Sequence, residues 1–420
     1  MSAHDHDLTQ LDSRIVASAA EGCEESKLLL SRRAALGLSA GFFTWAFTPH
    51  LAEASSSDPR LLIVLLRGGM DGLNVAVPIG DPQYAKLRGR LALVKENLLP
   101  LNSYFYLHPS LAFFKTLYNA GQATVVHAVA PPMKNRSHFE CQRNLENGTP
   151  GDKEDRTTGG WLNRLLSKLT PADRVKAGAL QIGPTPLILQ GTEKVLSWSP
   201  TLWPRPAGFD TSLLNLYKST DSALYDLLLK GITANSLATS TSGPALSPDA
   251  SSLQLSFRGA AKLLGAPSGA PRIAVLNVEG WDTHVGQPQA LAANLNNLDK
   301  SLSDFTAIAK NSGYWSDTVV LCVTEFGRTA KGNSDNGTDH GVGTVAMLAG
   351  GAVKGGKVVA NWPGLSNLYD GRDLRPTYDL RQVFKSVIRS HLGVQDKKIL
   401  DEVVFPGSSL ISALPELIRT

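Results

Sequence analysis

The sequence predicts an α/β fold in which helices cover a mainly parallel sheet, and two observations carry this prediction. Apolar runs without polar alternation recur along the chain, and such runs are typical of strands buried on both faces. Amphipathic helical patterns lie between these runs, and an alternation of this kind specifies an α/β domain. In addition, 38 glycines and 24 prolines among 420 residues fit many short turns and argue against a helical bundle.

The predicted strands lie at residues 61–66, 123–129, 272–278, 318–323 and 344–348. The first strand reads LLIVLL, and Gly, Pro, Asn or Asp flanks every run. The clearest helix spans residues 290–310, where apolar side chains recur at three- and four-residue steps. Further helices are predicted at residues 109–119, 140–147, 213–229, 252–264 and 380–391. Ligands of such folds bind at the carboxyl ends of the strands, so we expect the functional residues there.

The first 54 residues are predicted to be an export signal that is cleaved after Ala54. Arg32 and Arg33 precede the apolar stretch 34–47, and Ala52-Glu53-Ala54 follows it as a small-x-small cleavage site. This pattern is typical of a substrate of the twin-arginine (Tat) export machinery and predicts a periplasmic or secreted protein. The apolar stretch is too short for a comfortable membrane span, so we expect no stable span after cleavage. An uncleaved N-terminal anchor is the alternative.

Residues 55–420 are expected to form a single α/β domain with an inserted cap region at about residues 186–265. Within that region, residues 234–252 carry one charge and no periodicity, which predicts a surface loop. The net charge of +4 and the absence of a Lys/Arg run exclude nucleic acid as a partner. Cys141 and Cys322 remain after cleavage, too few for a disulfide framework.

Asp71 is the first candidate metal ligand. It follows the first predicted strand in the segment RGGMDG, residues 67–72. Glycines allow a sharp turn and the close approach of a ligand, and a carboxylate in that place suits a hard cation. The alternative is a turn aspartate that accepts a hydrogen bond from its own backbone.

The segment Arg136-Ser137-His138 follows the second predicted strand and stands at a helix start. The hydroxyl of Ser137 has two interpretations. It is either an N-cap that forms a capping box with Glu140, or a nucleophile at a helix N-terminus that stabilises anions. In the second interpretation Arg136 binds phosphate or sulfate oxygens, while His138 is a ligand, a general acid or a packing residue.

The pair Asp282 and His284 follows the third predicted strand. Imidazole with carboxylate is a common zinc set, and in an extended segment two residues at this spacing lie on the same face. A chance pair in a solvated loop is the alternative.

Glu325 ends the fourth predicted strand, where a carboxylate is costly to bury without a partner. We therefore expect either Arg328 or a cation beside it. Asp339 and His340 precede the next strand, and we expect Asp339 to orient His340 as a ligand.

Five motifs occur in the order LRGGMDGLN, RSHF, GWDTH, TEFGRT and TDHG. With them the chain, over roughly residues 60–415, resembles the domain of unknown function 1501 family, Tat-exported bacterial proteins related to the alkaline phosphatase superfamily. The resemblance implies an alkaline phosphatase-like three-layer sandwich. It also implies a divalent metal, either zinc, calcium or manganese, as one or two ions.

The superfamily pattern is carried over residue by residue. Asp71 resembles its first ligand, Ser137 its nucleophile, and Asp282, His284 and His340 its later ligands. A departure occurs where the superfamily has an Asp-His dipeptide and this chain has Glu325-Phe326.

Phenylalanine cannot bind a metal, so this departure removes a ligand from one of the two usual sites, and His138 is a candidate to replace it. The predicted catalytic residues are Arg136, Ser137 and His138. The predicted metal ligands are Asp71, Asp282, His284, Glu325, Asp339 and His340.

The resemblance implies an exported metal-dependent hydrolase of phosphate or sulfate esters with a serine nucleophile. Its substrate would be a small-molecule or a polymer-borne ester. The alternative is a non-catalytic exported binding protein that retains the fold with a degenerate metal site.

Overall fold

The computed structural model describes residues 58–151, 157, 159–169, 178–200, 206–241, 243–266 and 271–419. The predicted export signal lies outside these residues. None of the helices in the described ranges combines the length and the apolar character that a membrane crossing requires.

A nine-stranded sheet forms the centre of the fold, in the order β11-β5-β10-β9-β1-β8-β6-β7, with β12 paired to β5. Its strands are β1 (Arg60–Leu66), β5 (Ala123–Ala130), β6 (Ala179–Ile182), β7 (Leu196–Trp198), β8 (Ile273–Val278), β9 (Thr318–Val323), β10 (Thr344–Ala349), β11 (Lys357–Val359) and β12 (Tyr378–Asp379). Every pairing is parallel except those of β10, which runs antiparallel to both of its neighbours. The expected α/β class with a mainly parallel sheet is therefore confirmed.

Helices cover both faces of this sheet. The helices of the described residues are α3 (Gly72–Val75), α4 (Tyr84–Arg88), α5 (Ala112–Asn119), α6 (His138–Asn147), α7 (Trp161–Leu166), α8 (Phe209–Thr220), α9 (Ser222–Thr239), α10 (Ser252–Leu264), α11 (Gln287–Asn311) and α12 (Leu380–Ser390). Short 3-10 helices span Gly89–Leu91, Lys95–Asn97, Leu187–Leu189 and Trp315–Asp317, and a π-helical turn spans Ile399–Val404. A separate small sheet contains β2 (Ala76–Val77), β3 (Leu99–Pro100) and β4 (Tyr106–Leu107).

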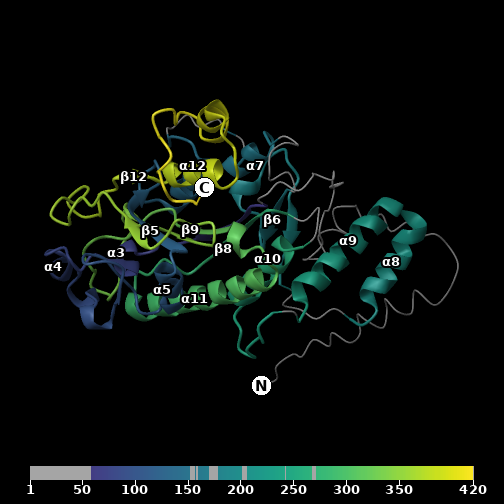
Figure 1. Ribbon diagram of the computed structural model, residues 1–420, viewed down its shortest axis with the longest axis horizontal. Coiled ribbons are helices and arrows are strands. Elements are labelled where there is room, and N and C mark those ends of the chain that lie inside the picture. The colour runs from purple at the N-terminus through teal and green to yellow at the C-terminus, as the bar shows by residue number, and fades with distance from the viewer. Residues whose placement is uncertain are drawn as a thin grey trace, which may run out of the picture. The chain divides into compact units, whose positions relative to one another are not determined.

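The buried strand β1 shows why the arrangement has three layers. Its side chains alternate between two hydrophobic clusters, with Leu62, Val64 and Leu66 in one and Leu61, Ile63 and Leu65 in the other. The first cluster includes side chains of α5, α10 and α11, and the second includes side chains of α7 and α12. In Figure 1 these two groups of helices lie on opposite sides of the strands.

Two predicted elements differ from the structure. The helix predicted at residues 213–229 is divided into α8 and α9, because Asp221 adopts an extended conformation and its carboxylate caps α9 by accepting hydrogen bonds from two backbone N–H groups. The loop predicted to begin at residue 234 begins later, because α9 continues to Thr239 and buries Ala234 and Ala238.

Residues 186–265, the region expected to form a cap, contain the strand β7, the helices α8, α9 and α10, and the 3-10 helix Leu187–Leu189. Its strand β7 pairs with β6 in the central sheet, and its helix α10 packs against α11. The helices α8 and α9 pack against each other, and α9 also packs against α10.

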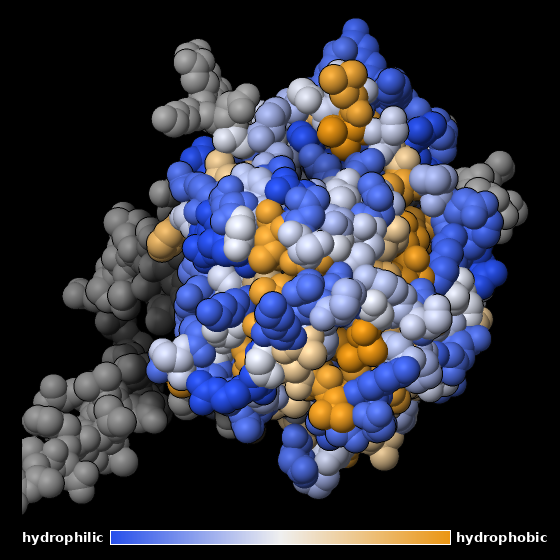
Figure 2. Space-filling model, turned by 90° about the vertical axis from the view of Figure 1, so that its left-hand side faces the viewer, coloured by the Kyte–Doolittle hydropathy of each residue, from blue (hydrophilic) through white to orange (hydrophobic). Residues whose placement is uncertain are grey.

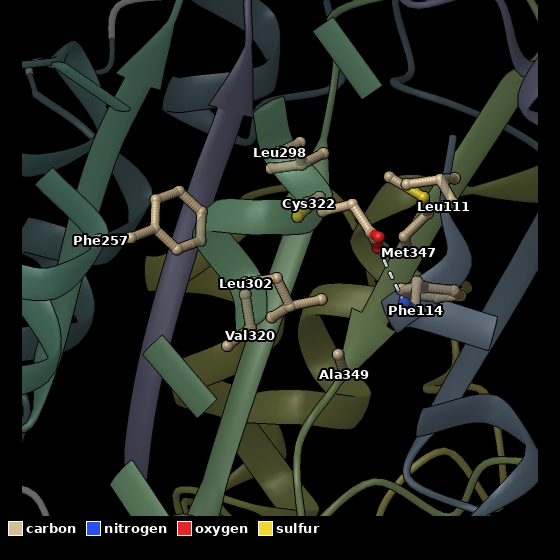
Figure 3. Close-up of a pocket in the computed structure, with 10 residues that line it drawn as sticks. Leu111, Phe114, Phe257, Leu298, Leu302, Val320, Cys322, Met347 and Ala349 are labelled. Carbon is tan, nitrogen blue, oxygen red and sulfur yellow. Dashed lines mark hydrogen bonds between the residues drawn. The ribbon is translucent and has the colours of Figure 1, made fainter. Parts of the chain in front are cut away.

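A small cavity lies between the sheet and the layer of α5, α10 and α11 (Figure 3). Its lining is apolar except for Asp299, and it includes Phe114, Phe257 and Cys322. The carboxylate of Asp299 accepts hydrogen bonds from the backbone N–H groups of Phe113 and Phe114, both at 2.8 Å. The cavity therefore belongs to the hydrophobic core, and its polar group stabilises the start of α5.

Candidate metal centre

Five chain segments meet at one edge of the central sheet. The carboxyl ends of β1, β5, β8 and β9 lie there because these strands are parallel. The amino end of β10 joins them because β10 runs in the opposite direction. In Figure 1, α3 marks this edge directly after β1. Figure 2 views the molecule from the side on which α3 and α4 lie, where hydrophobic patches alternate with hydrophilic areas.

Three imidazole groups from three of these segments converge at this edge. The Nε2 atom of His340 lies 3.0 Å from the Nε2 atom of His138 and 3.0 Å from that of His284. The carboxylate of Asp282 lies beside all three rings, at 3.1 Å from His284 Nε2, 3.2 Å from His340 Nε2 and 3.4 Å from His138 Nε2. The side chains are 26% exposed for His138 and His340, 40% for His284 and 43% for Asp282, so the group is open to solvent.

The outer nitrogen atoms of the rings face hydrogen-bond acceptors. The Nδ1 atom of His138 lies 2.8 Å from the carboxylate of Glu325, and that of His340 lies 3.0 Å from the backbone carbonyl of Arg136. The Nδ1 atom of His284 lies 3.4 Å from a carboxylate oxygen of Asp339. The expectation that Asp339 orients the adjacent His340 is therefore wrong. Asp339 faces His284, and the carbonyl of Arg136 takes the place beside His340.

These partners determine where the ring protons lie. A carboxylate or a carbonyl can only accept, so the acceptors at Nδ1 of His138 and of His340 favour a proton on Nδ1. With the proton on Nδ1, neutral rings of His138 and His340 would direct Nε2 lone pairs toward one another at 3.0 Å, a repulsive arrangement that a cation would relieve. Tetrahedral zinc with bonds of about 2.0–2.1 Å separates its ligand atoms by about 3.3 Å. The corresponding distances among His138, His340 and Asp282 are 3.0, 3.2 and 3.4 Å. The residues present therefore fit a metal ion.

Glu325 holds His138 from a fully buried position. One of its oxygen atoms accepts hydrogen bonds from His138, from Gln142 and from the backbone of Gly68, and the other accepts one from Thr324. Burial alone would raise the pKa of Glu325, but these hydrogen bonds hold the pKa below its usual value. The hydrogen bond to Glu325 in turn raises the pKa of His138. Glu325 is thus placed to orient a ligand.

A close backbone contact fixes the end of β1 beside this group. Gly68 has a φ of +121°, and a Cβ atom there would lie 2.3 Å from the backbone nitrogen of Asp282. Only glycine fits this position, since any side chain would collide with the segment that carries Asp282.

Arg328 pairs with Asp282 and not with Glu325, the partner that the sequence led us to consider. Its guanidinium donates to Asp282 at 2.6 Å, to the carbonyl of Gly68 and to the hydroxyl of Thr338. Burial tends to raise the pKa of Asp282, but the pairing with Arg328 lowers it overall. Because Arg328 is fully buried and occupied by these acceptors, it positions Asp282 and is not available to a substrate.

Asp71 lies outside the imidazole group, in a buried ion pair with Arg88. It also accepts hydrogen bonds from the backbone of Leu73, as a turn aspartate does, and from the side chain of Gln287. A hydrogen-bonded chain connects it to the group, since Gln287 accepts from Thr338, which accepts from Arg328. Asp71 therefore contacts the site only indirectly.

Ser137 occupies the N-cap position of α6, but its hydroxyl makes no capping hydrogen bond. The side chain of Glu140 accepts from Asn135, so the capping box that we considered is not formed. The guanidinium of Arg136 donates to Asp373 at 2.6 Å and to Asp370 at 2.8 Å, which directs it away from the phosphate-binding role expected of it.

The sequence interpretation missed the residues that hold these groups. Arg88 lies in a short helix and Gln287 at the start of α11, positions where such residue types are normally solvated and carry no signal. Asp373 lies near the end of the chain in the segment DLRPTYDLR, where its pairing with Arg136 depends on the loop between β11 and β12.

Sequence comparison matches residues 263–404 to the family described as Protein of unknown function (DUF1501). This part of the chain is similar to the DUF1501 family. The part matched to DUF1501 contains Asp282, His284 and His340, whereas His138 and Ser137 precede it. No curated protein matches the sequence.

Three solved structures illustrate what the chain is similar to. The lipoteichoic acid synthase LtaP from Listeria monocytogenes is 10% identical, with a TM-score of 0.38, and the match covers 85% of this chain and 77% of that chain. The phosphonate monoester hydrolase of Agrobacterium radiobacter is 12% identical, with a TM-score of 0.34, and the match covers 81% of this chain and 74% of that chain. A protein in the alkaline phosphatase superfamily from Vibrio parahaemolyticus is 12% identical, with a TM-score of 0.30, and the match covers 82% of this chain and 69% of that chain.

Proposed function

We propose that this protein is an exported metal-dependent hydrolase of phosphate or sulfate esters. The observation that carries the proposal is the convergence of three imidazole Nε2 atoms beside Asp282, within reach of solvent. His138, His340 and Asp282, whose ligand atoms all lie within 4.8 Å of one another, would hold one divalent ion, and His284 beside His340 is a candidate further ligand. Imidazole nitrogen atoms together with a carboxylate oxygen suit zinc, whereas calcium prefers oxygen ligands.

When bound, the ion supplies Lewis acidity and positive charge for the ester group. Glu325 and the carbonyl of Arg136 orient the rings of His138 and His340 for this purpose. Arg328 orients Asp282, and Asp339 faces His284. Asp71, Glu325 and Asp339, which the sequence suggested as ligands, would therefore serve as positioning residues.

Ser137 is the proposed nucleophile because it directly precedes His138 and its hydroxyl makes no capping bond. The free backbone N–H groups in the first turn of α6 favour negative charge there. The hydroxyl attacks phosphorus or sulfur, the bond to the ester oxygen breaks, and the hydroxyl proton passes to the departing alcohol. Water then cleaves the ester on Ser137, which releases phosphate or sulfate and restores the hydroxyl.

The second candidate function is an exported binding protein with the same metal group. Two observations favour it: Asp71 is neutralised by Arg88, and Phe326 occupies the position after Glu325 as a buried side chain. Among the described residues, one group of His and Asp side chains is close enough to hold an ion. A two-ion reaction is therefore not proposed.

Metal content and hydrolysis together separate the two functions. We expect the purified protein to bind about one zinc equivalent, the His340→Ala variant to lose it, and the Ser137→Ala variant to keep it. Hydrolysis of aryl phosphate and aryl sulfate esters should disappear in both variants and persist in Ser366→Ala, which removes an exposed hydroxyl elsewhere.

Zinc without hydrolysis in any of these proteins would favour the binding function, and a protein that binds no metal would exclude both functions.

Export has a separate test. Replacement of Arg32 and Arg33 by lysine should leave the protein in the cytoplasmic fraction, and unchanged export would contradict the Tat assignment.

A further inference from the structure

Three cationic side chains surround the ring of Tyr369. The Nζ atom of Lys134 lies 5.6 Å from the ring centroid, and the guanidinium carbon atoms of Arg136 and Arg375 lie at 5.9 and 5.8 Å. We call this group, Tyr369 with its three cations, the tyrosine platform. An aromatic face attracts a cation, so the ring accounts for the position of each of them. It does not neutralise their mutual repulsion.

The carboxylates near the platform are already used by other cations. Arg136 binds both Asp370 and Asp373, and Arg372 also pairs with Asp373. Arg375 donates to neutral acceptors, the side chain and backbone of Asn367 and the carbonyl of Leu368.

Lys134 is exposed, and neither Lys134 nor Arg375 forms an ion pair with any carboxylate in the described ranges. The platform therefore carries two positive charges without a counter-charge, and it would be stabilised by an anion.

Two contacts join the platform to the candidate metal centre. The backbone carbonyl of Arg136 accepts the hydrogen bond from His340 Nδ1, while the guanidinium of the same residue contacts Tyr369. Arg372, three residues after Tyr369, donates to the backbone carbonyl of His340. Arg136 and Arg372 therefore connect the loop that carries the platform to His340 of the candidate metal centre.

We infer that Lys134 and Arg375 form a subsite for a second anionic group of the substrate, so that the substrate is a linear polymer with repeated phosphate or sulfate groups. This inference rests on the proposed function. One repeat of the polymer occupies the metal centre, and a neighbouring repeat binds the two uncompensated cations. A phosphate polymer and a sulfated polysaccharide share this chemistry.

The test measures binding without turnover, in the zinc-loaded Ser137→Ala protein. The probes are inorganic polyphosphate, dextran sulfate and neutral dextran, each with a fluorescent end label, and the readout is anisotropy at several salt concentrations. Lys134→Gln and the double change Lys134→Gln with Arg375→Gln are introduced into this protein. Arg375→Lys keeps the positive charge but removes the guanidinium that donates to Asn367 and Leu368. It therefore tests whether polymer binding depends on the charge of Arg375 or on these hydrogen bonds.

Lys95→Gln is the matched control, because Lys95 is also exposed and lies 5.5 Å from the ring centroid of a single tyrosine, Tyr106. We expect the double change to weaken binding of an anionic polymer about tenfold, at roughly threefold for each of the two cations. A plot of the logarithm of the binding constant against the logarithm of the salt concentration should become shallower by about 1.4, because each lost contact removes about 0.7 from its slope. Lys134→Gln should weaken binding about threefold and change the slope by about half as much as the double change. Arg375→Lys and Lys95→Gln should show little change.

Binding of polyphosphate alone, or of dextran sulfate alone, supports the subsite and identifies the source of the anion. Equal affinity in all variants, an equal loss in Lys95→Gln, or binding of neutral dextran would overturn it. Since this assay needs no hydrolysis, its failure is distinguishable from failure of the proposed function. In the protein with an intact Ser137, the double change should raise KM for the polymer and leave KM for a small aryl ester unchanged.

Discussion

At the scale of single residues, the position of one ring proton decides what His138 can do. Glu325 accepts from Nδ1 of His138 and leaves Nε2 free to bind a metal. Glutamine in place of Glu325 can keep an acceptor oxygen in that position but removes the charge. We expect Glu325→Gln to weaken zinc binding about tenfold and Glu325→Ala about a hundredfold, the range found for residues that orient ligands.

Competition with a chromophoric chelator measures these affinities, and circular dichroism checks that the variants are folded. Gln142→Ala is the matched control, because Gln142 donates to the same oxygen atom of Glu325 and is not one of the proposed ligands. An affinity of Glu325→Gln equal to that of the unchanged protein would mean that Glu325 only fills space.

The residue scale also shows how far the sequence could lead. Asp282 and His284 were recognisable as a possible ligand pair because they stand two residues apart after a buried strand. The role of Asp71 was not recognisable, because its neutralising partner Arg88 comes from a different segment and only tertiary packing brings the two together. Local pattern thus identifies residue types suited to metal binding, and packing decides which of them remain available.

At the scale of elements, the direction of β10 explains why the site is complete. His340 precedes β10, and in a fully parallel sheet it would lie at the opposite edge from His138 and His284. The apolar run at residues 344–348 predicted a strand but carried no information about its direction, since both directions bury the same side chains. The convergence of the three imidazoles therefore depends on a strand direction that the residue pattern does not encode.

The start of α5 depends on a side chain from another helix, and this gives a prediction for stability. Leu111, the N-cap residue of α5, has no side-chain acceptor, and Asp299 of α11 accepts the N–H groups of Phe113 and Phe114 in its place. Because these groups are buried, Asp299→Ala should lower the free energy of unfolding by about 2 kcal/mol. Asp299→Asn keeps one acceptor oxygen and should cost about half as much.

Urea unfolding of both variants measures this effect. The matched comparison is Asp221→Ala, because Asp221 caps α9 in the same way but at an exposed position. We expect a loss there of about 1 kcal/mol. A loss for Asp299→Ala no greater than that for Asp221→Ala would show that α5 does not rely on the buried contact.

At the scale of the whole molecule, the proposed ligands join segments that follow β5 and β8 and precede β10. Such a site exists only when the sheet has formed, so metal binding and folding should stabilise each other. The α/β class with a mainly parallel sheet was predictable because buried strands and amphipathic helices have different periodicities, whereas the three-layer arrangement was implied only by the family resemblance. The order of the strands was not, since it depends on pairings between residues more than two hundred positions apart, as in β1 with β8.

Three buried histidines outside the site make stability depend on pH. Burial lowers the pKa of His108, His127 and His391 to about 4 each. Their folded-state pKa lies below the unfolded value of about 6.5, so the unfolded chain binds protons first as the pH falls. The stability that these neutral rings provide is complete above pH 6.5 and is lost between pH 6.5 and pH 4. At pH 5 each of these histidines should have lowered the free energy of unfolding by about 2 kcal/mol.

His391→Gln tests this dependence, because Nε2 of His391 lies 2.8 Å from the backbone carbonyl of Arg60 and a glutamine amide can donate to the same atom. We expect the fall in unfolding free energy between pH 7 and pH 5 to be smaller in this variant by about 2 kcal/mol. Urea titrations at the two pH values measure it. The metal ligands titrate equally in both proteins and cancel in the difference. An identical pH dependence in the two proteins would mean that His391 is already charged, or equally hydrated, in the folded state.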